Sequence, residues 1–173
     1  GKTSISNIQY HIENQHDIII CGMNKTRKTI NDLVRRSRGY DSPTPIAGER
    51  VVCLQNTIIK DQGRINNGEL FTVEAVFPGK VVSRYILISE DGRDRFTVNV
   101  KNDCWKTEKM ERKFGTQAIV PMTFGYCLSC HKVQGSTFGD VLFVDEDVSF
   151  FLNRQKFRYT GTTRAANMLT VAT

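Results

Sequence analysis

The chain has 173 residues, 39% of them hydrophobic and 24% charged, so it can bury a core and is not a disordered segment. This length suits one domain, or one domain with a small inserted module. Lys and Arg outnumber Asp and Glu by 24 to 18, and the resulting net charge of +6 suits a polyanionic partner. Because no apolar stretch reaches the roughly 18 residues of a membrane-spanning helix, we expect a cytoplasmic protein without membrane contact.

The first part of the chain is predicted to form a helix, a strand and a second helix. The first helix is expected to end near Gln15, before a buried strand over the apolar run Asp17–Cys21. Asn24 or Thr26 is suited to cap the second helix. This helix is rich in cations, which form either a solvated surface or a set of phosphate contacts: Lys25, Arg27, Lys28, Arg35, Arg36 and Arg38.

The middle of the chain changes to the pattern of short strands. After a break at Pro43–Pro45, four segments are rich in Val, Ile, Phe and Thr: Arg50–Leu54, Leu70–Phe77, Val81–Ser89 and Arg95–Val100. Turn signals separate them at Asn66–Gly68, Pro78–Gly79 and Asp91–Gly92. Four or five short strands in this space predict a small antiparallel β-barrel over residues 47–102.

The last part of the chain returns to the pattern of an α/β domain. The expected elements are short strands at Ala118–Val120 and Tyr126–Ser129, a buried strand at Val141–Val144, a helix over Phe150–Asn167 and a strand over Met168–Ala172. The predicted fold is therefore an α/β domain with a parallel sheet and helices, made of residues 1–46 and 103–173 and interrupted by the barrel.

One short string formally matches cofactor-binding motifs. Cys127, Cys130 and His131 form a C-x-x-C-H pattern, which is shared by c-type haem attachment sites and resembles half of a zinc site or a redox pair. A closed zinc site needs more ligands than this cluster provides, and haem attachment suits a cytosolic chain poorly. We therefore expect no metal site here.

Two segments carry a more specific resemblance. Ser129–Gly135 (S-C-H-K-V-Q-G) and, about thirty residues later, Tyr159–Ala165 (Y-T-G-T-T-R-A) resemble motifs V and VI of superfamily 1 DNA helicases of the RecD-like and Dda-like type. Weaker matches to the same family are Asn24–Arg27 with Asn31 and Arg35, and the elements Gly48–Val52 and Asn66–Glu69 of its inserted barrel. The chain is identified by these motifs as similar to the second motor domain of such helicases.

The resemblance implies a fold, an activity and a set of partners. The fold is a RecA-like, P-loop-type sheet that carries an SH3-like barrel. The activity is ATP-dependent translocation on single-stranded DNA, 5′ to 3′, with unwinding at a duplex junction, in the cytoplasm of a bacterium or in a phage-infected cell. ATP and Mg²⁺ would be bound mainly by an N-terminal motor domain, so this chain alone is expected to be inactive as an ATPase.

The resemblance also implies roles for single residues. Arg164 corresponds to the arginine that stabilises charge on the γ-phosphate, and Gln134 and Gly135 would lie beside the nucleotide. The DNA contacts would be Asn24, Arg27, Ser129, His131 and Lys132. Gly161 departs from the usual Ala of motif VI, which should cost about 1 kcal/mol of helix stability.

Two alternatives stay open from the sequence. Lys2 lies in a string that resembles the tail of a Walker A loop, and Asp145 and Glu146 end a strand like that of a Walker B motif, so a complete P-loop NTPase is one alternative. Most of the phosphate-cradling loop is missing from this sequence, which argues against it. The other alternative is a nucleic-acid-binding module without catalysis.

Overall fold

The computed structural model describes residues 12, 16–146 and 153–173, which form two compact units. The first unit comprises residues 1–40 and 126–173, and the second comprises residues 41–125. The expected first helix and the Walker-like string around Lys2 lie outside the described residues. The second unit, residues 41–125, is longer than the barrel predicted over residues 47–102. It extends beyond residue 102 because the segment that follows the barrel strands also belongs to it.

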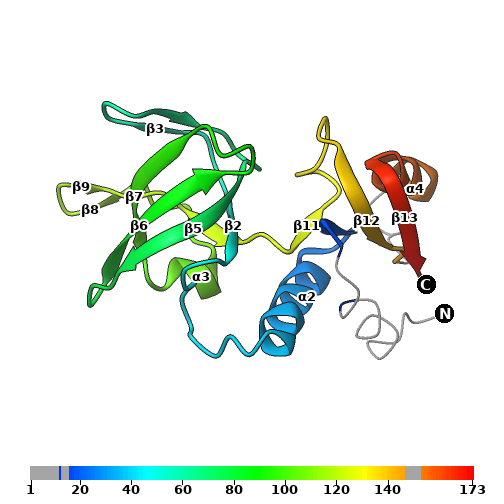
Figure 1. Ribbon diagram of the computed structural model, residues 1–173, viewed down its shortest axis with the longest axis horizontal. Coiled ribbons are helices and arrows are strands. Elements are labelled where there is room, and N and C mark those ends of the chain that lie inside the picture. The colour runs from blue at the N-terminus through cyan, green and yellow to red at the C-terminus, as the bar shows by residue number, and fades with distance from the viewer. Residues whose placement is uncertain (1–11, 13–15, 147–152) are drawn as a thin grey trace. The chain divides into compact units, whose positions relative to one another are not determined.

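The first unit is a parallel sheet with the strand order β11-β1-β12-β13 (Figure 1). All three strand pairs in this order are parallel. Its elements are β1 (Ile18–Cys21), α2 (Asn24–Ser37), β11 (Cys127–Ser129), β12 (Phe138–Val144), α4 (Arg154–Thr162) and β13 (Ala165–Ala172). Strands β1 and β11 are buried along their whole length, as expected for short apolar strands of a parallel sheet.

Two helices pack on this sheet. Helix α2 buries Ile30 and Val34, which lie four residues apart on one face of the helix. Helix α4 is anchored by Phe157, whose ring centroid lies 5.0 Å from that of Phe143 on β12. Gly161 of α4 is also buried against the Phe143 ring.

The second unit is built on a five-stranded antiparallel sheet in the order β10-β2-β5-β6-β7. Its elements are β2 (Arg50–Cys53), β3 (Thr57–Ile59), β4 (Gly63–Ile65), β5 (Leu70–Phe77), β6 (Val82–Ser89), β7 (Arg95–Lys101), α3 (Cys104–Thr107), β8 (Lys113–Phe114), β9 (Gln117–Ala118) and β10 (Met122–Phe124). The amide of Val120 donates to the carbonyl of Asn99 at 2.8 Å and so links the two ends of the sheet. The predicted small barrel is therefore present.

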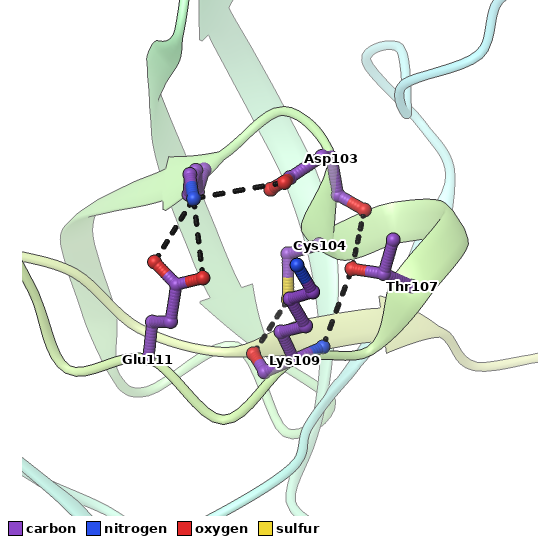
Figure 2. A network of polar contacts seen from close by, with 6 residues as sticks. Asp103, Cys104, Thr107, Lys109 and Glu111 are labelled. Atoms are coloured by element: carbon purple, nitrogen blue, oxygen red, sulfur yellow. Dashed lines mark hydrogen bonds and ion pairs between the residues drawn. The ribbon is translucent and has the colours of Figure 1, made fainter.

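The segment after β7 is fastened to the barrel by polar contacts and by aromatic packing. The ammonium of Lys101 pairs with Asp103 at 3.6 Å and with Glu111 at 3.0 Å (Figure 2). Trp105 of α3 lies edge-on to Tyr85, with 5.5 Å between the ring centroids, and it also packs on Phe124. These contacts explain why the second unit extends to residue 125.

The observed elements differ from the predicted ones in three places. Of the strand expected over Ala118–Val120, only Ala118 lies in a strand, at the end of β9, and β10 does not begin until Met122. The β3–β4 hairpin was not predicted. The helix expected to reach Asn167 ends at Thr162, because parallel pairing with β12 already begins at Ala165. The part of this prediction that covers residues 150–152 lies outside the described residues. No helix in the described part of the chain is long and apolar enough to cross a membrane.

Candidate functional site

The residues predicted to contact nucleotide and DNA lie mainly in the 129–137 turn, between β11 and β12. The amide of Lys132 donates to the carbonyl of Ser129 at 2.9 Å, and the fully buried Val133 anchors the middle of the turn. Three of the predicted contact residues are exposed on it: His131, Gln134 and Gly135. The positive φ of 90° at Gly135 explains why glycine occupies this position.

The strand that leads into this turn is held in place by one side chain from α2. The Oδ1 atom of Asn31 accepts from the amides of Tyr126 and Cys127, at 3.0 and 2.9 Å, and its Nδ2 donates to the carbonyl of Cys127 at 3.2 Å. Asn31 is buried, so these bonds form away from solvent. Sequence reasoning noted Asn31 only as part of a family pattern and did not predict this role.

Arg164 joins the end of α4 to the 129–137 turn. Its guanidinium donates to the carbonyl of Ser136 at 3.0 Å, the carbonyl of Thr160 at 3.1 Å and the hydroxyl of Thr163 at 3.0 Å. The side chain is partly exposed. Because a guanidinium carries five N–H groups, three bonds leave two N–H groups for another acceptor. The structure thus places Arg164 against the residue that follows Gly135.

A pocket of about 140 Å³ lies between this turn and α4. It is lined by Cys130, His131, Gln134, Asn153, Lys156, Phe157 and Thr160. Burial raises the pKa of the Cys130 thiol to about 12, so the thiol stays protonated at neutral pH and does not act as a nucleophile. The lining shows that two predicted contact residues, His131 and Gln134, share one cavity with side chains of α4.

The start of α2 is capped by a carboxylate from the end of β12. Glu146 Oε2 accepts from the amides of Gly22 and Met23, at 2.6 and 3.0 Å, and Oε1 accepts from the Thr26 hydroxyl. A negative charge at a helix N-terminus is favourable because the helix dipole is positive there. The predicted caps Asn24 and Thr26 are therefore wrong: Met23 is the N-cap residue and makes no side-chain capping bond.

The DNA contacts predicted on α2 and β11 have different environments. Asn24 is exposed, whereas the Arg27 side chain is 1% exposed and the Ser129 side chain is also buried. A direct phosphate contact needs an accessible donor, so burial argues against that role for Arg27 and Ser129. Arg27 Nε donates to Asn24 Oδ1 at 3.4 Å, which suggests that Arg27 helps to position the helix surface.

The carboxylates assigned to a possible Walker B motif are both engaged in structural contacts. Arg158 of α4 donates through Nε to the two oxygens of Asp145, at 3.0 and 3.1 Å, and this contact lowers the pKa of Asp145. Glu146 caps α2 as described above. Lys2, the third residue of that alternative, lies outside the described residues. Both carboxylates are thus bound to groups of this chain, and these contacts do not support the P-loop NTPase alternative.

The two cysteines of the C-x-x-C-H string are buried in the first unit. Cys127 is fully buried, and its thiol donates to Cys21 Sγ at 3.6 Å. Among residues 12, 16–146 and 153–173, no three or more His, Cys, Asp or Glu side chains gather as metal ligands do. The cysteines of this string are parts of the core.

Comparisons with known proteins agree with this geometry. Residues 124–172 match the model of the UvrD-like helicase C-terminal domain. This C-terminal segment is therefore similar in sequence to that domain. No curated protein matches the chain in a sequence search.

Solved structures of helicases share the fold. The Pif1 helicase from Candida albicans is similar with a TM-score of 0.58 and 18% identity, over 92% of this chain and 45% of the helicase. Pif1 helicase from Bacteroides in complex with ADP-AlF3 and ssDNA has a TM-score of 0.59 and 18% identity, over 93% of this chain and 42% of the helicase. Bacteroides Pif1 bound to ssDNA has a TM-score of 0.57 and 17% identity, over 97% of this chain and 45% of the helicase.

These matches confirm the resemblance to superfamily 1 helicases and the RecA-like α/β fold with an inserted small barrel. The chain spans less than half the length of the Pif1 helicases that it resembles. Residues 124–172, which match the family model, include the 129–137 turn, the lining of the pocket and Arg164. Asn31 lies outside this segment, and its side chain still holds β11, which lies within it.

Proposed function

We propose that this chain is the second motor domain of an ATP-dependent DNA helicase. The observation that carries the proposal is the placement of Arg164, which is partly exposed and retains two N–H groups after bonding to Ser136, Thr160 and Thr163. A planar, permanently charged guanidinium held in this way suits a developing negative charge on phosphate oxygens. The UvrD-like segment supports the proposal because it contains both Arg164 and the 129–137 turn.

In this proposal, ATP is bound mainly by another motor domain of the same protein. Arg164 approaches the γ-phosphate from this side and stabilises the charge of phosphoryl transfer, with Gln134 and Gly135 beside the nucleotide. Mg²⁺, which would neutralise phosphate charge, is likewise bound mainly by the other motor domain, as the resemblance to superfamily 1 helicases implies. The chain alone is then not an ATPase.

The proposed nucleic-acid partner is single-stranded DNA next to a duplex junction. His131, Lys132 and Asn24 are the predicted contacts whose side chains are at least partly accessible. A turn that carries His131 beside Gln134 provides a direct mechanical link between the strand and the nucleotide. The 5′-to-3′ polarity and the cytoplasmic location of such a helicase remain part of the proposal.

The test of this function is the Arg164→Ala variant of the protein that carries this domain together with its first motor domain. We expect DNA-stimulated ATP turnover to fall by at least about 10³-fold, the scale seen for arginine fingers, while affinity for single-stranded DNA changes little. Arg154→Ala is the matched control on the same helix and should keep its turnover. Turnover in Arg164→Ala equal to that of the parent would refute the role.

A non-catalytic nucleic-acid-binding module is the second candidate. The exposed cations of α2 and the net charge of +6 are what favour it. The same experiment separates the two, because a protein in which this chain is a non-catalytic module binds DNA but shows no DNA-stimulated ATP turnover.

A further inference from the structure

The hairpin between β5 and β6 presents an aromatic ring beside an arginine. Phe77 and Arg84 are direct cross-strand partners, and the Arg84 Cζ atom lies 4.9 Å from the centroid of the Phe77 ring. Phe77 is 46% exposed and Arg84 is exposed as well. A large apolar ring is usually buried, so its exposure next to a cation points to a binding surface.

This hairpin, residues 77–84, is held in one conformation. Ser83 Oγ accepts from the amide of Gly79 at 3.1 Å and donates to Asn102 Oδ1 at 2.7 Å. Asn102 also donates to the carbonyl of Gly79 at 2.7 Å through Nδ2, and to that of Val81 at 2.8 Å through its amide. Such a preformed surface loses little conformational entropy when a partner binds.

The charge of the hairpin is positive and locally unbalanced. Residues 75–89 contain Lys80 and Arg84 but no Asp or Glu. The acidic residues that flank this stretch are occupied elsewhere, because Glu74 pairs with Arg95 and Glu90 pairs with Arg50. Within the described part of the chain, no carboxylate forms an ion pair with Lys80 or Arg84. The cations therefore remain available to an anionic partner.

We propose that hairpin 77–84 is a second contact for single-stranded nucleic acid, outside the RecA-like unit. One base stacks on the accessible part of the Phe77 ring, and backbone phosphates pair with Arg84 and Lys80. Single strands expose the faces of their bases, which a duplex hides, and an aromatic ring between cations is the usual platform for them. The inference deepens the proposed DNA-binding function by assigning part of it to the barrel.

The test compares the 173-residue chain with its Phe77→Leu variant, using the fluorescence anisotropy of a labelled oligo-dT strand at low salt. Leucine preserves the apolar character but removes the ring, so we expect affinity to fall about tenfold, within the range for one stacked base. Phe114→Leu is the matched control, because Phe114 is 43% exposed in another hairpin of the same unit and its neighbour in sequence, Lys113, is a cation. We expect its affinity to match that of the parent.

A second variant tests the electrostatic part of the proposal. Arg84→Gln should lower the slope of log affinity against log salt by about 0.7, the value for one phosphate contact with a single strand. Unchanged affinity in Phe77→Leu, or an equal loss in Phe114→Leu, would overturn the inference and leave a protein partner to explain the exposed ring. These outcomes are independent of the Arg164 test, because oligonucleotide binding is measured without ATP turnover.

Discussion

The side-chain amide of Asn31 makes the hydrogen bonds that a neighbouring strand would make at the edge of the first sheet. Strand β11 stands at one end of the order β11-β1-β12-β13, so its outer backbone groups have no strand partner among the described residues. Asn31 binds both the amide and the carbonyl of Cys127 on that edge. An unpaired backbone group in a buried position would otherwise be costly, so this contact fixes where the 129–137 turn begins.

We expect Asn31→Ala to destabilise the chain strongly. The substitution leaves two buried amides and one buried carbonyl without the partner they now have, at a cost of about 3 kcal/mol in the free energy of unfolding. Urea unfolding of both proteins at neutral pH measures this difference. Lys25→Ala, an exposed position of the same helix, should change stability by less than about 0.5 kcal/mol. Equal effects of the two substitutions would show that the Asn31 bonds are not important.

The ion pair of Asp145 predicts a pH dependence of stability. Hydrogen bonding from Arg158, together with its charge, lowers the pKa of Asp145 in the folded chain. The folded state therefore favours the ionised carboxylate, and the stabilisation is present at neutral pH and lost as the pH falls below the unfolded value of about 3.9. Asp145→Asn should lower the free energy of unfolding at pH 7 and have a much smaller effect at pH 3.

Urea unfolding of Asp145→Asn, Arg158→Gln and the double variant at both pH values measures this coupling. At pH 7 the double variant should be hardly less stable than either single variant, because each substitution already breaks the same pair. Fully additive effects at pH 7 would show that the contact contributes nothing to stability.

At the scale of elements, Gly161 shows how packing overrides helix propensity. From the sequence, glycine inside the motif VI helix was expected to cost about 1 kcal/mol relative to alanine. In the structure a Cβ atom at this position would lie 2.2 Å from Cε2 and 2.4 Å from Cδ2 of Phe143. Phe143 is itself buried and packed against Phe157, so its ring has little room to move. Glycine is therefore what allows α4 to approach β12.

We predict that Gly161→Ala destabilises the chain by about 1–3 kcal/mol despite the better helix propensity of alanine, because the buried ring is overpacked. Thermal or urea unfolding measures the change. Adding Phe143→Leu to Gly161→Ala should recover part of the loss, since the smaller side chain makes room for the methyl group. A Gly161→Ala protein more stable than the parent would mean that the sheet accommodates the methyl group freely.

The elements that the sequence predicted well are those with a strong local pattern. The run Ile18–Cys21 and the alternating strands Leu70–Phe77 and Arg95–Lys101 have apolar patterns that mark them as strands, and their predicted bounds differ from the observed ones by at most one residue. The end of α4 was not predicted correctly, because it depends on the pairing of Ala165 with Phe138, which is a contact between segments far apart in the chain. Local patterns do not contain such contacts.

For the candidate site, too, the sequence indicates what has a local pattern and not the contacts between distant segments. The exposed residues of the 129–137 turn and Arg164 were identified from two short motifs. The strand that leads into the turn is held by Asn31, and α2, which carries Asn31, is capped by Glu146. Both residues lie about one hundred residues or more from their partners along the chain. Glu146 follows an apolar strand, and that signal was compatible with a Walker B motif as well as with a helix cap. Only the folded chain separates these two possibilities.

At the scale of the whole molecule, the positive charge is not shared equally by the two units. Residues 1–40 and 126–173 carry a net charge of +5 and residues 41–125 carry +1, which together make the +6 of the chain. Helix α2 and its C-cap residue contribute exposed cations to the first unit: Lys25, Lys28 and Arg36 in the helix, and Arg38 at the cap. Long-range attraction of a polyanion should therefore depend mainly on the RecA-like unit, with hairpin 77–84 adding a local contact.

This distribution predicts the salt dependence of nucleic-acid binding. Replacing Lys25, Lys28 and Arg36 by Gln removes three exposed charges from α2, so the slope of log affinity against log salt should fall by about 2 if all three meet phosphates of a single strand. The control replaces Lys106, Lys109 and Arg112, three exposed cations of the second unit that lie outside hairpin 77–84. Oligonucleotide titrations between about 50 and 200 mM salt provide both slopes. Because a phosphate contact releases counterions whereas a merely solvated cation does not, an unchanged slope in the α2 variant would identify that helix face as solvated surface.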